Sequence, residues 1–555
     1  MKKSRIILRF LFLLILLSDF GLLFAQSKGL KTITEKELRY HLDFLGAKEF
    51  RGRETPSPEL DIATLYVANW SRNAGLKPIM QDGSFYQSVP VTVTKVFQPG
   101  TRIRVSGGKG ERIYYFGQTF GGNFSVNGSY SGDVVFAGLG ISDPEHGWDD
   151  LKDLDLRGKI VIILDALRPG YKTAPGPYHY YRLNSVVSVL HGRGASAVLS
   201  VVSPEREAKL DSGFNIFDDI PAGMLGIIYD SQRTNAEANS RKIPDETGRP
   251  SLPFEQAEIS HRVAADILGM TGNDITGMFM KIEQGQQVAV KEVSGVRVQM
   301  DVAVEYLNRT SRNVVAVVEG SDPLLRNEYV IICGHPDGLG LREGEVLPGA
   351  DDNGTATVAL MEIAQALLTE RPKRSVIIAW FTGEEKMMNG SHYFINNCPV
   401  PVEKISACLN MDMLGRNNTD SLYLVCPDLL SSELDASINK LNRKSGINFG
   451  FDYRYSNLSN PEQVYFRSDH YPFIRFGIPS VWFFSGFTPD YHTPRDTPEL
   501  INYEKFFRIT KLVYLTAFDI GNMKDLLKLD VNPKVTSRGK QNLNESSLFE
   551  YTGHQ

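Results

Sequence analysis

Imidazole and carboxylate side chains recur in the second half of the chain, where short apolar runs end. The candidate metal ligands are His335, Asp351, Glu385, Asp412 and His492, and they are accompanied by Asp337 and Glu384. Two imidazoles and three carboxylates suit zinc or another divalent ion that prefers nitrogen and oxygen ligands. Five ligands on one ion would leave little room for a substrate, whereas two ions sharing one carboxylate would each keep an open position. The residues therefore predict a site for two ions.

The apolar runs have the pattern of strands buried on both faces. Tyr329–Cys333 and 376–381 are short, rich in β-branched residues and free of charge, which is typical of parallel strands. Between them, residues 357–370 repeat apolar side chains at close to a helical period. Because open α/β sheets bind ligands at the carboxyl ends of their strands, this βαβ unit is expected to gather the acids and imidazoles at one edge.

Length, charge and cysteine content narrow the class of protein. A chain of 555 residues is too long for one core, so two or three domains are expected. The net charge of −5 offers no basic surface for nucleic acid. The four cysteines show no CxxC spacing, which argues against a zinc knuckle or a disulfide scaffold, but leaves a Cys398–Cys426 bridge open.

The first 25 residues have the features of a secretory signal peptide. Four basic residues precede or border an apolar stretch, and Ala25 stands before a polar segment. Asp19 and Gly21 interrupt the apolar run, so an uncleaved membrane anchor is the weaker alternative. We expect an exported protein, periplasmic or extracellular, without stable membrane anchoring after cleavage.

The rest of the chain is expected to form one divided domain with an insert. Residues 26–97 contain two amphipathic helices, the first with a capping box at Thr34 and Glu37, and the second ended by Gly75. Residues 98–291 are expected to form a β-rich module, and residues 292–524 are expected to form the main part of the α/β domain. Residues 525–555 are polar and predict a tail that is loosely held or docked on a partner.

Five motifs in order carry a specific resemblance: His335-Pro-Asp337, Gly349-Ala-Asp-Asp352-Asn, Gly383-Glu-Glu385, Asn410-Met-Asp412 and Tyr491-His492-Thr-Pro-Arg-Asp496. The chain resembles the secreted di-zinc aminopeptidases of the aminopeptidase Y and bacterial leucyl aminopeptidase type. Their superfamily includes glutamate carboxypeptidase and the transferrin receptor. The resemblance covers about residues 30–97 and 298–520. The insert is similar to a protease-associated domain through the segments Gly158–Leu164 and Gly194–Val201.

The resemblance implies a fold and a set of roles. The fold would be a zinc-exopeptidase fold, with a mixed, largely parallel sheet flanked by helices. His335, Glu385, Asp412 and His492 would be zinc ligands, Asp351 would bridge two Zn²⁺ ions, and a cis peptide would follow at Asp351–Asp352. Glu384 would be the general base and Asp337 would support His335, while Tyr491 and Arg467 are candidates to stabilise the oxyanion.

The expected substrates are peptides cleaved from a free N-terminus, because no arginine cluster suited to a C-terminal carboxylate is readable in the sequence. A glutamate carboxypeptidase-like enzyme remains the first alternative. A glutaminyl cyclase-like enzyme with one zinc ion is a second, and a binding protein on an inactive peptidase fold is a third.

Overall fold

The computed structural model describes residues 27–107, 110–122, 124, 127–168, 186–217, 223–225, 255–457 and 464–539. The predicted signal peptide and residues 540–555 of the predicted tail lie outside this range. The chain divides into two compact units: one holds the chain up to Pro90, Thr310–Gly340 and the chain from Val346, and the other holds Val91–Arg309 with Leu341–Glu345. Among the described residues, no helix has both the length and the apolar character needed to cross a membrane.

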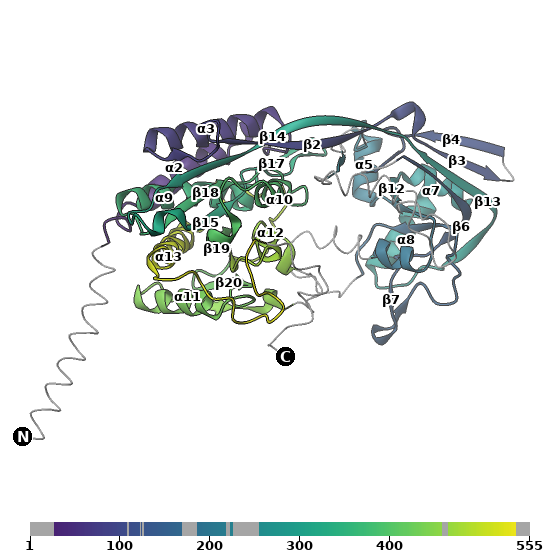
Figure 1. The fold of residues 1–555 in the computed structure, drawn as a ribbon. Helices are drawn as coiled ribbons and strands as arrows, with labels where there is room; N and C mark the ends of the chain where they lie inside the picture. The colour runs from purple at the N-terminus through teal and green to yellow at the C-terminus, as the bar shows by residue number, and fades with distance from the viewer. Residues whose placement is uncertain are drawn as a thin grey trace, which may run out of the picture. The chain divides into compact units, whose positions relative to one another are not determined.

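A mixed sheet with a parallel centre organises the first unit (Figure 1). Its strand order is β11-β2-β14-β18-β15-β19-β22-β20-β21, and β1 also pairs with β14. The parallel centre consists of β18 (Ser375–Trp380), β15 (Tyr329–Gly334), β19 (Ile405–Met411) and β22 (Ser480–Phe484). The other strands are β1 (Lys77–Pro78), β2 (Tyr86–Val96), β14 (Val304–Val318), β20 (Ser421–Val425) and β21 (Gly450–Asp452). The remaining strand, β11 (Gly223–Leu225), belongs to the second unit and pairs with Thr92–Thr94, the part of β2 that lies in the same unit.

Helices cover both faces of the parallel strands. One face carries α2 (Glu35–Leu45), α3 (Pro58–Ala74), α9 (Thr355–Thr369), α11 (Ser432–Lys444) and α13 (Tyr503–Asn522), and the other carries α10 (Asn389–Asn396) and α12 (His470–Arg475). Along β15, Val330 and Ile332 pack toward the first layer, while Ile331 and Cys333 pack toward the second. Burial on both faces explains the unbroken apolar runs.

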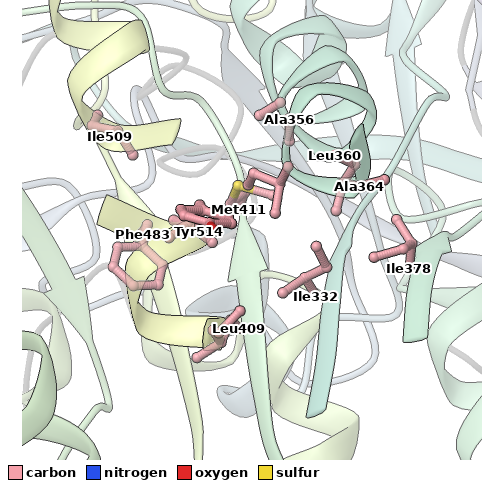
Figure 2. Close-up of a cluster of buried hydrophobic side chains, with 14 of the residues drawn as sticks. Ile332, Ala356, Leu360, Ala364, Ile378, Leu409, Met411, Phe483, Ile509 and Tyr514 are labelled. Carbon is pink, nitrogen blue, oxygen red and sulfur yellow. The ribbon is translucent and has the colours of Figure 1, made fainter. Parts of the chain in front are cut away.

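Figure 2 shows how α9 lies over the strands. Ala356, Leu360 and Ala364, four residues apart on one side of the helix, face Ile332 and Ile378. All five side chains are fully buried. Truncation of a buried leucine such as Leu360 to alanine typically costs about 2–5 kcal/mol. This packing fixes α9, and with it the segment that enters the helix from the candidate site.

The N-terminal helices begin and end where the sequence predicts. The Thr34 hydroxyl accepts the Glu37 amide at the start of α2, and Ser57 accepts the Leu60 amide at the start of α3. Gly75 ends α3 with φ +94°, a conformation that favours glycine. Both predicted helices are confirmed.

The second unit contains its own mixed sheet, of order β4-β3-β13-β6-β9-β10-β12-β5. Its strands are β3 (Arg102–Gly107), β4 (Gly110–Tyr115), β5 (Phe120–Gly121), β6 (Gly128–Phe136), β9 (Ile160–Leu164), β10 (Ala197–Val201), β12 (Glu255–Ile259) and β13 (Lys291–Val302). The helices α5 (Pro204–Asp211), α7 (His261–Leu268) and α8 (Gly272–Glu283) complete it. The predicted strands at 160–164 and 197–201 are confirmed, and they pair in parallel.

The second unit extends beyond the boundaries expected for the insert, residues 98 and 291. β13 pairs with β3 and β6, so the chain stays in the second unit until Arg309. Such long-range pairing leaves no local signal in the sequence. β2 and β14, which are neighbours in the sheet, both continue across the division between the units.

Short elements complete the chain. They are β7 (Ser142–Asp143), β8 (Trp148–Asp149), β16 (Gly340–Arg342), β17 (Glu345–Leu347) and the helical turns η1 (Lys48–Phe50), η2 (Gln98–Gly100), η3 (Pro144–His146), η4 (Leu325–Asn327), η5 (Ala350–Gly354), η6 (Val402–Lys404), η7 (Arg454–Ser456), η8 (Val464–Phe466) and η9 (Pro498–Leu500).

The prediction of a loosely held tail is wrong for residues 525–539. Leu527 and Val535 are each only 1% exposed, and the Leu527 amide donates to Ser406. Two apolar side chains anchor a segment whose composition is otherwise polar. All four cysteines are free, so the Cys398–Cys426 bridge is not formed.

Candidate metal centre

The carboxyl ends of neighbouring parallel strands bring the predicted residues together. His335 directly follows β15, Glu384 and Glu385 follow β18, and Asp412 follows β19. His492 lies in the loop after β22. Since these strands are adjacent and parallel, their ends meet at one edge of the sheet, where open α/β folds bind ligands.

Two groups of possible metal ligands lie at this edge. One consists of His335, Glu384 and Asp412, and the other of Asp352, Glu385 and His492; in each group the ligand atoms lie within 4.8 Å of one another. His335 Nε2 is 3.5 Å from Asp412 Oδ2 and 3.7 Å from Glu384 Oε2. His492 Nε2 is 3.4 Å from Glu385 Oε2.

The Asp352 carboxylate contacts both groups. Its Oδ1 is 3.5 Å from His335 Nε2, and its Oδ2 is 3.0 Å from His492 Nε2. A single carboxylate between two imidazoles, with one oxygen toward each, has the arrangement of a bridging ligand. It therefore joins the two groups into one candidate site.

Asp351, the predicted bridge, does not occupy this position. Its Oδ1 accepts the Gly415 amide at 2.6 Å, and its side chain belongs to neither ligand group. The cis peptide likewise lies at Asp352–Asn353, one residue later than expected. The sequence offers two adjacent aspartates, and the irregular backbone of η5, which is non-helical at Asp352 and Asn353, turns the second one to the site.

The donor atoms suit a metal ion. His335 Nε2, Glu385 Oε1 and Asp412 Oδ1 are buried and have no hydrogen-bond partner. Burying such polar atoms costs free energy unless they form hydrogen bonds or coordinate a cation. Imidazole nitrogens with carboxylate oxygens form a donor set that zinc prefers. The residues present thus fit the predicted cofactor.

A second layer of residues orients these groups. His335 Nδ1 lies 3.5 Å from Asp337 Oδ1, and Asp337 Oδ1 also accepts the Glu384 amide at 3.3 Å. The Ser468 hydroxyl donates to Asp412 Oδ2 at 2.7 Å, a contact that sequence reasoning missed because serine carries no distinctive spacing. Such partners fix the tautomer and orientation of ligands.

Asp496 supports the backbone of the site. Its carboxylate accepts the backbone amides of Asp351 at 2.9 Å and Asp352 at 3.0 Å. Arg416 Nη2 lies 3.4 Å from the same carboxylate. Asp496 therefore holds the backbone that presents Asp352.

The pKa shifts report a strong excess of negative charge. Burial alone would lower the pKa of His335, but Asp412 and Glu384 raise it well above its usual value. Burial, followed by the charges of Glu385 and Asp412, raises the pKa of Asp352 to about 7. Burial also raises the pKa of Glu384 well above the ordinary range, with Asp412 adding to it and His335 opposing it. Cations would relieve this repulsion.

Tyr491 and Arg467 lie together beside His492. Arg467 Nη2 is 3.4 Å from the Tyr491 hydroxyl, and the Tyr491 ring centroid is 3.7 Å from that of His492. The two predicted oxyanion donors thus border one of the ligand groups. His470, in contrast, turns its Nε2 to the Tyr465 carbonyl at 2.8 Å and lies outside both groups.

Sequence and structure comparisons point to one family. Residues 313–517 match the sequence model of Peptidase family M28. Leucine aminopeptidase 2 of Trichophyton rubrum is 25% identical over 353 residues, which cover 57% of this chain and 68% of that protein. Probable leucine aminopeptidase 2 of Arthroderma benhamiae is 26% identical over 309 residues, which cover 49% of this chain and 59% of that protein.

A solved zinc aminopeptidase from Bacillus subtilis shares the fold, with a TM-score of 0.51 and 17% identity over 92% of this chain and 99% of that one. The family match covers the strands β15, β18, β19 and β22, whose ends carry or precede the candidate ligands. Residues 313–517, which contain all five motifs of the candidate site, are therefore similar to Peptidase family M28, and the fold is that of a solved zinc aminopeptidase.

Proposed function

We propose that this chain is an exported zinc aminopeptidase that holds two zinc ions and uses Glu384 as its general base. The observation that carries the proposal is the Asp352 carboxylate, which contacts a ligand group on either side. The family supports a peptidase that uses zinc, and the names of the relatives support removal of N-terminal residues.

Each ion would have three protein ligands. His335, Asp412 and Asp352 would hold one, and Glu385, His492 and Asp352 would hold the other. Three protein ligands with an open position are the usual arrangement of catalytic zinc sites. Glu384, although close to His335, is then not needed as a ligand.

Bound zinc ions would supply Lewis-acid polarisation of the scissile carbonyl and activation of a water molecule. Glu384 takes the proton from the attacking water and later gives it to the leaving amine. Asp337 holds both the His335 ring and the Glu384 backbone, so base and ligand keep a fixed relation.

Tyr491 and Arg467 are suited to the developing oxyanion. The Tyr491 hydroxyl can donate a hydrogen bond, and the neighbouring guanidinium adds positive charge next to it. Arg467 also lies over the Phe487 ring at 5.0 Å, which fixes its position before substrate arrives.

The state of Arg416 favours cleavage from the N-terminus. A C-terminal carboxylate requires a free arginine or lysine near the ions. Arg416, which follows Asp412 in the chain, is ion-paired with Asp490 and Asp496, each at 3.4 Å, and donates to the Leu500 carbonyl. The many carboxylates of the site instead suit an α-ammonium group.

Export and the insert are further parts of the proposal. The signal-peptide pattern at residues 1–25 supports export. The adjacent parallel strands β9 and β10, which contain the two segments similar to a protease-associated domain, support that identity for the insert.

The test compares a peptide with a free N-terminus, its N-acetylated form and its C-terminal amide, using protein of measured zinc content. We expect about two zinc ions per chain, loss of cleavage on acetylation, and tolerance of the amide. The reverse substrate pattern would favour a carboxypeptidase. One zinc ion with cyclisation of N-terminal glutamine, and no cleavage, would favour a glutaminyl cyclase-like enzyme.

A further inference from the structure

A buried arginine from the N-terminal segment reaches the base of the candidate site. Arg53 is only 1% exposed and makes no ion pair within hydrogen-bond distance among the described contacts. Its guanidinium donates to four backbone carbonyls instead: Pro336 at 2.8 Å, Leu45 at 2.7 Å, Pro348 at 2.8 Å and Gly349 at 2.8 Å.

Three of these carbonyls belong to segments that carry metal-ligand candidates. Pro336 lies between His335 and Asp337, and Pro348 and Gly349 directly precede η5, which presents Asp352. One planar guanidinium thus connects the segment of the first imidazole to the segment of the shared carboxylate. The Thr357 hydroxyl, 3.0 Å from the carbonyl oxygens of both His335 and Asn353, makes a second and smaller connection between the same segments.

The backbone around Arg53 continues the same connection. The Arg53 carbonyl accepts the Gly338 amide at 3.2 Å, and the Thr55 hydroxyl accepts the Gly383 amide at 3.2 Å, next to Glu384. Gly349 has φ +59°, and an added Cβ would clash with the Asp352 carbonyl oxygen and lie 3.3 Å from Arg53 Nη2. A side chain at this position would therefore crowd both the Asp352 backbone and the guanidinium.

The positive charge of Arg53 interacts with the carboxylates of the candidate site. Burial lowers its pKa, while the carboxylates of Asp496, Asp337, Asp352 and Glu385 oppose that shift. Arginine nevertheless remains charged in proteins. Because its donors are used by carbonyls, Arg53 offsets the negative charge of the site without competing for the oxygens that would bind metal.

We infer that Arg53 is a positioning residue for the metal centre, which sets the relation between His335 and Asp352 and thereby the affinity for the ions. The inference rests on the proposed function, since it concerns the site that would hold zinc. A lysine cannot replace it, because a single ammonium lacks the planar set of donors that reaches four carbonyls at once.

Arg374 offers a matched control. It is 0% exposed, donates to the carbonyls of Ile520, Met523 and Lys524, and pairs with Glu328. It precedes β18, whereas Glu384 follows that strand, so Arg374 lies at the opposite end of the sheet from the candidate site. It shares the burial and bonding of Arg53 without the link to metal ligands.

The experiment measures zinc affinity of the metal-free full chain by competition with a chromophoric chelator, together with the absorption spectrum of the Co²⁺ form. Folding is followed by circular dichroism and thermal unfolding. We expect Arg53→Lys and Arg53→Met to fold, to bind zinc about 10–100-fold more weakly than wild type, and to change the cobalt spectrum, since partners behind metal ligands typically have effects of this size. Arg374→Lys should lower the melting temperature and keep zinc affinity within about twofold of wild type, which lies below that range.

Wild-type zinc affinity and cobalt spectrum in both Arg53 variants would overturn the inference. An equal loss of affinity in Arg374→Lys, or failure of Arg53→Lys to fold, would also overturn it, because Arg53 would then serve the fold alone. Absence of zinc binding by the wild-type chain would instead refute the proposed function, and the two failures are therefore distinguishable.

Discussion

Substitution of Asp352 by asparagine tests which aspartate bridges the two metal ions. The structure indicates Asp352, whereas the sequence motif predicted Asp351. Asp352 directs its two carboxylate oxygens to His335 and His492, at 3.5 and 3.0 Å. Asp351, its neighbour, directs Oδ1 to the Gly415 amide. The matched pair Asp352→Asn and Asp351→Asn therefore changes the same chemistry at adjacent positions with different expected outcomes.

The magnitude follows from the number of ligands. Structural zinc sites with four ligands contribute about 10–16 kcal/mol, or roughly 3–4 kcal/mol for each ligand. A free-energy change of about 1.4 kcal/mol corresponds to a tenfold change in a dissociation constant. Loss of the Asp352 charge should therefore weaken the binding of each ion by about 10²–10³-fold. Asp351→Asn keeps a carbonyl oxygen for the Gly415 amide, so we expect a loss of about 1 kcal/mol in stability and full metal content.

The assay is dialysis of both variants against buffered zinc, followed by elemental analysis, with peptide cleavage measured on the same samples. Asp352→Asn should retain less than one ion per chain at a free zinc concentration that saturates wild type. Zinc loss in Asp351→Asn together with retention in Asp352→Asn would refute the assignment and restore Asp351 as the bridge. Thermal unfolding of the metal-free proteins provides the control for folding.

Three other predictions concern the base, the insert and a buried acid. Glu384→Gln should lower turnover by about 10²–10⁴-fold with zinc content nearly intact, whereas Glu385→Gln should lose zinc; equal zinc loss in both would contradict their separate roles. Replacement of residues 91–309 by a short linker should alter KM and selectivity for peptide length more than metal content, since Leu341–Glu345, between His335 and Asp352 in the chain, belong to the insert's compact unit; unchanged selectivity would exclude a gating role. Glu362 is 1% exposed, and burial raises its pKa from 4.5 to about 8. Because the folded state holds the Glu362 proton more tightly than the unfolded state, this group contributes its full stabilisation below about pH 4.5 and loses it as the pH rises to about 8. The free energy of unfolding should fall over this range by at most on the order of 5 kcal/mol. Glu362→Gln should reduce the difference between the unfolding free energies measured with urea at pH 5 and pH 8.5. An unchanged difference would mean that other groups cause the loss of stability.

The parallel strands and most candidate ligands were predictable because their signals are local. Burial on both faces requires apolar runs such as Ile405–Met411, and His335, Glu385 and Asp412 follow such runs within a few residues. The order of motifs then gave four of the five proposed metal ligands. The structure brings these four together with Asp352.

The choice between Asp351 and Asp352 could not be made from sequence. Adjacent side chains diverge, and which one faces the ions depends on the irregular turn η5 and on the contact of its amides with Asp496, more than 140 positions later in the chain. Arg53 was missed for a similar reason. A lone arginine in a loop resembles a solvated charge until the fold closes four carbonyls around it.

The neighbouring strands β2 and β14 have a consequence for the history of the chain. The insert leaves the sheet on one strand and returns on the strand beside it. Because the entropy of closing a loop grows only slowly with its length, a short turn and a whole domain are both tolerated between such strands. The pairing of β14 with β18, from Val314 opposite Trp380 to Val318 opposite Val376, lies wholly outside the insert. An ancestral peptidase could therefore have gained, lost or exchanged this domain in one genetic event while the strands that carry the metal ligands kept their register.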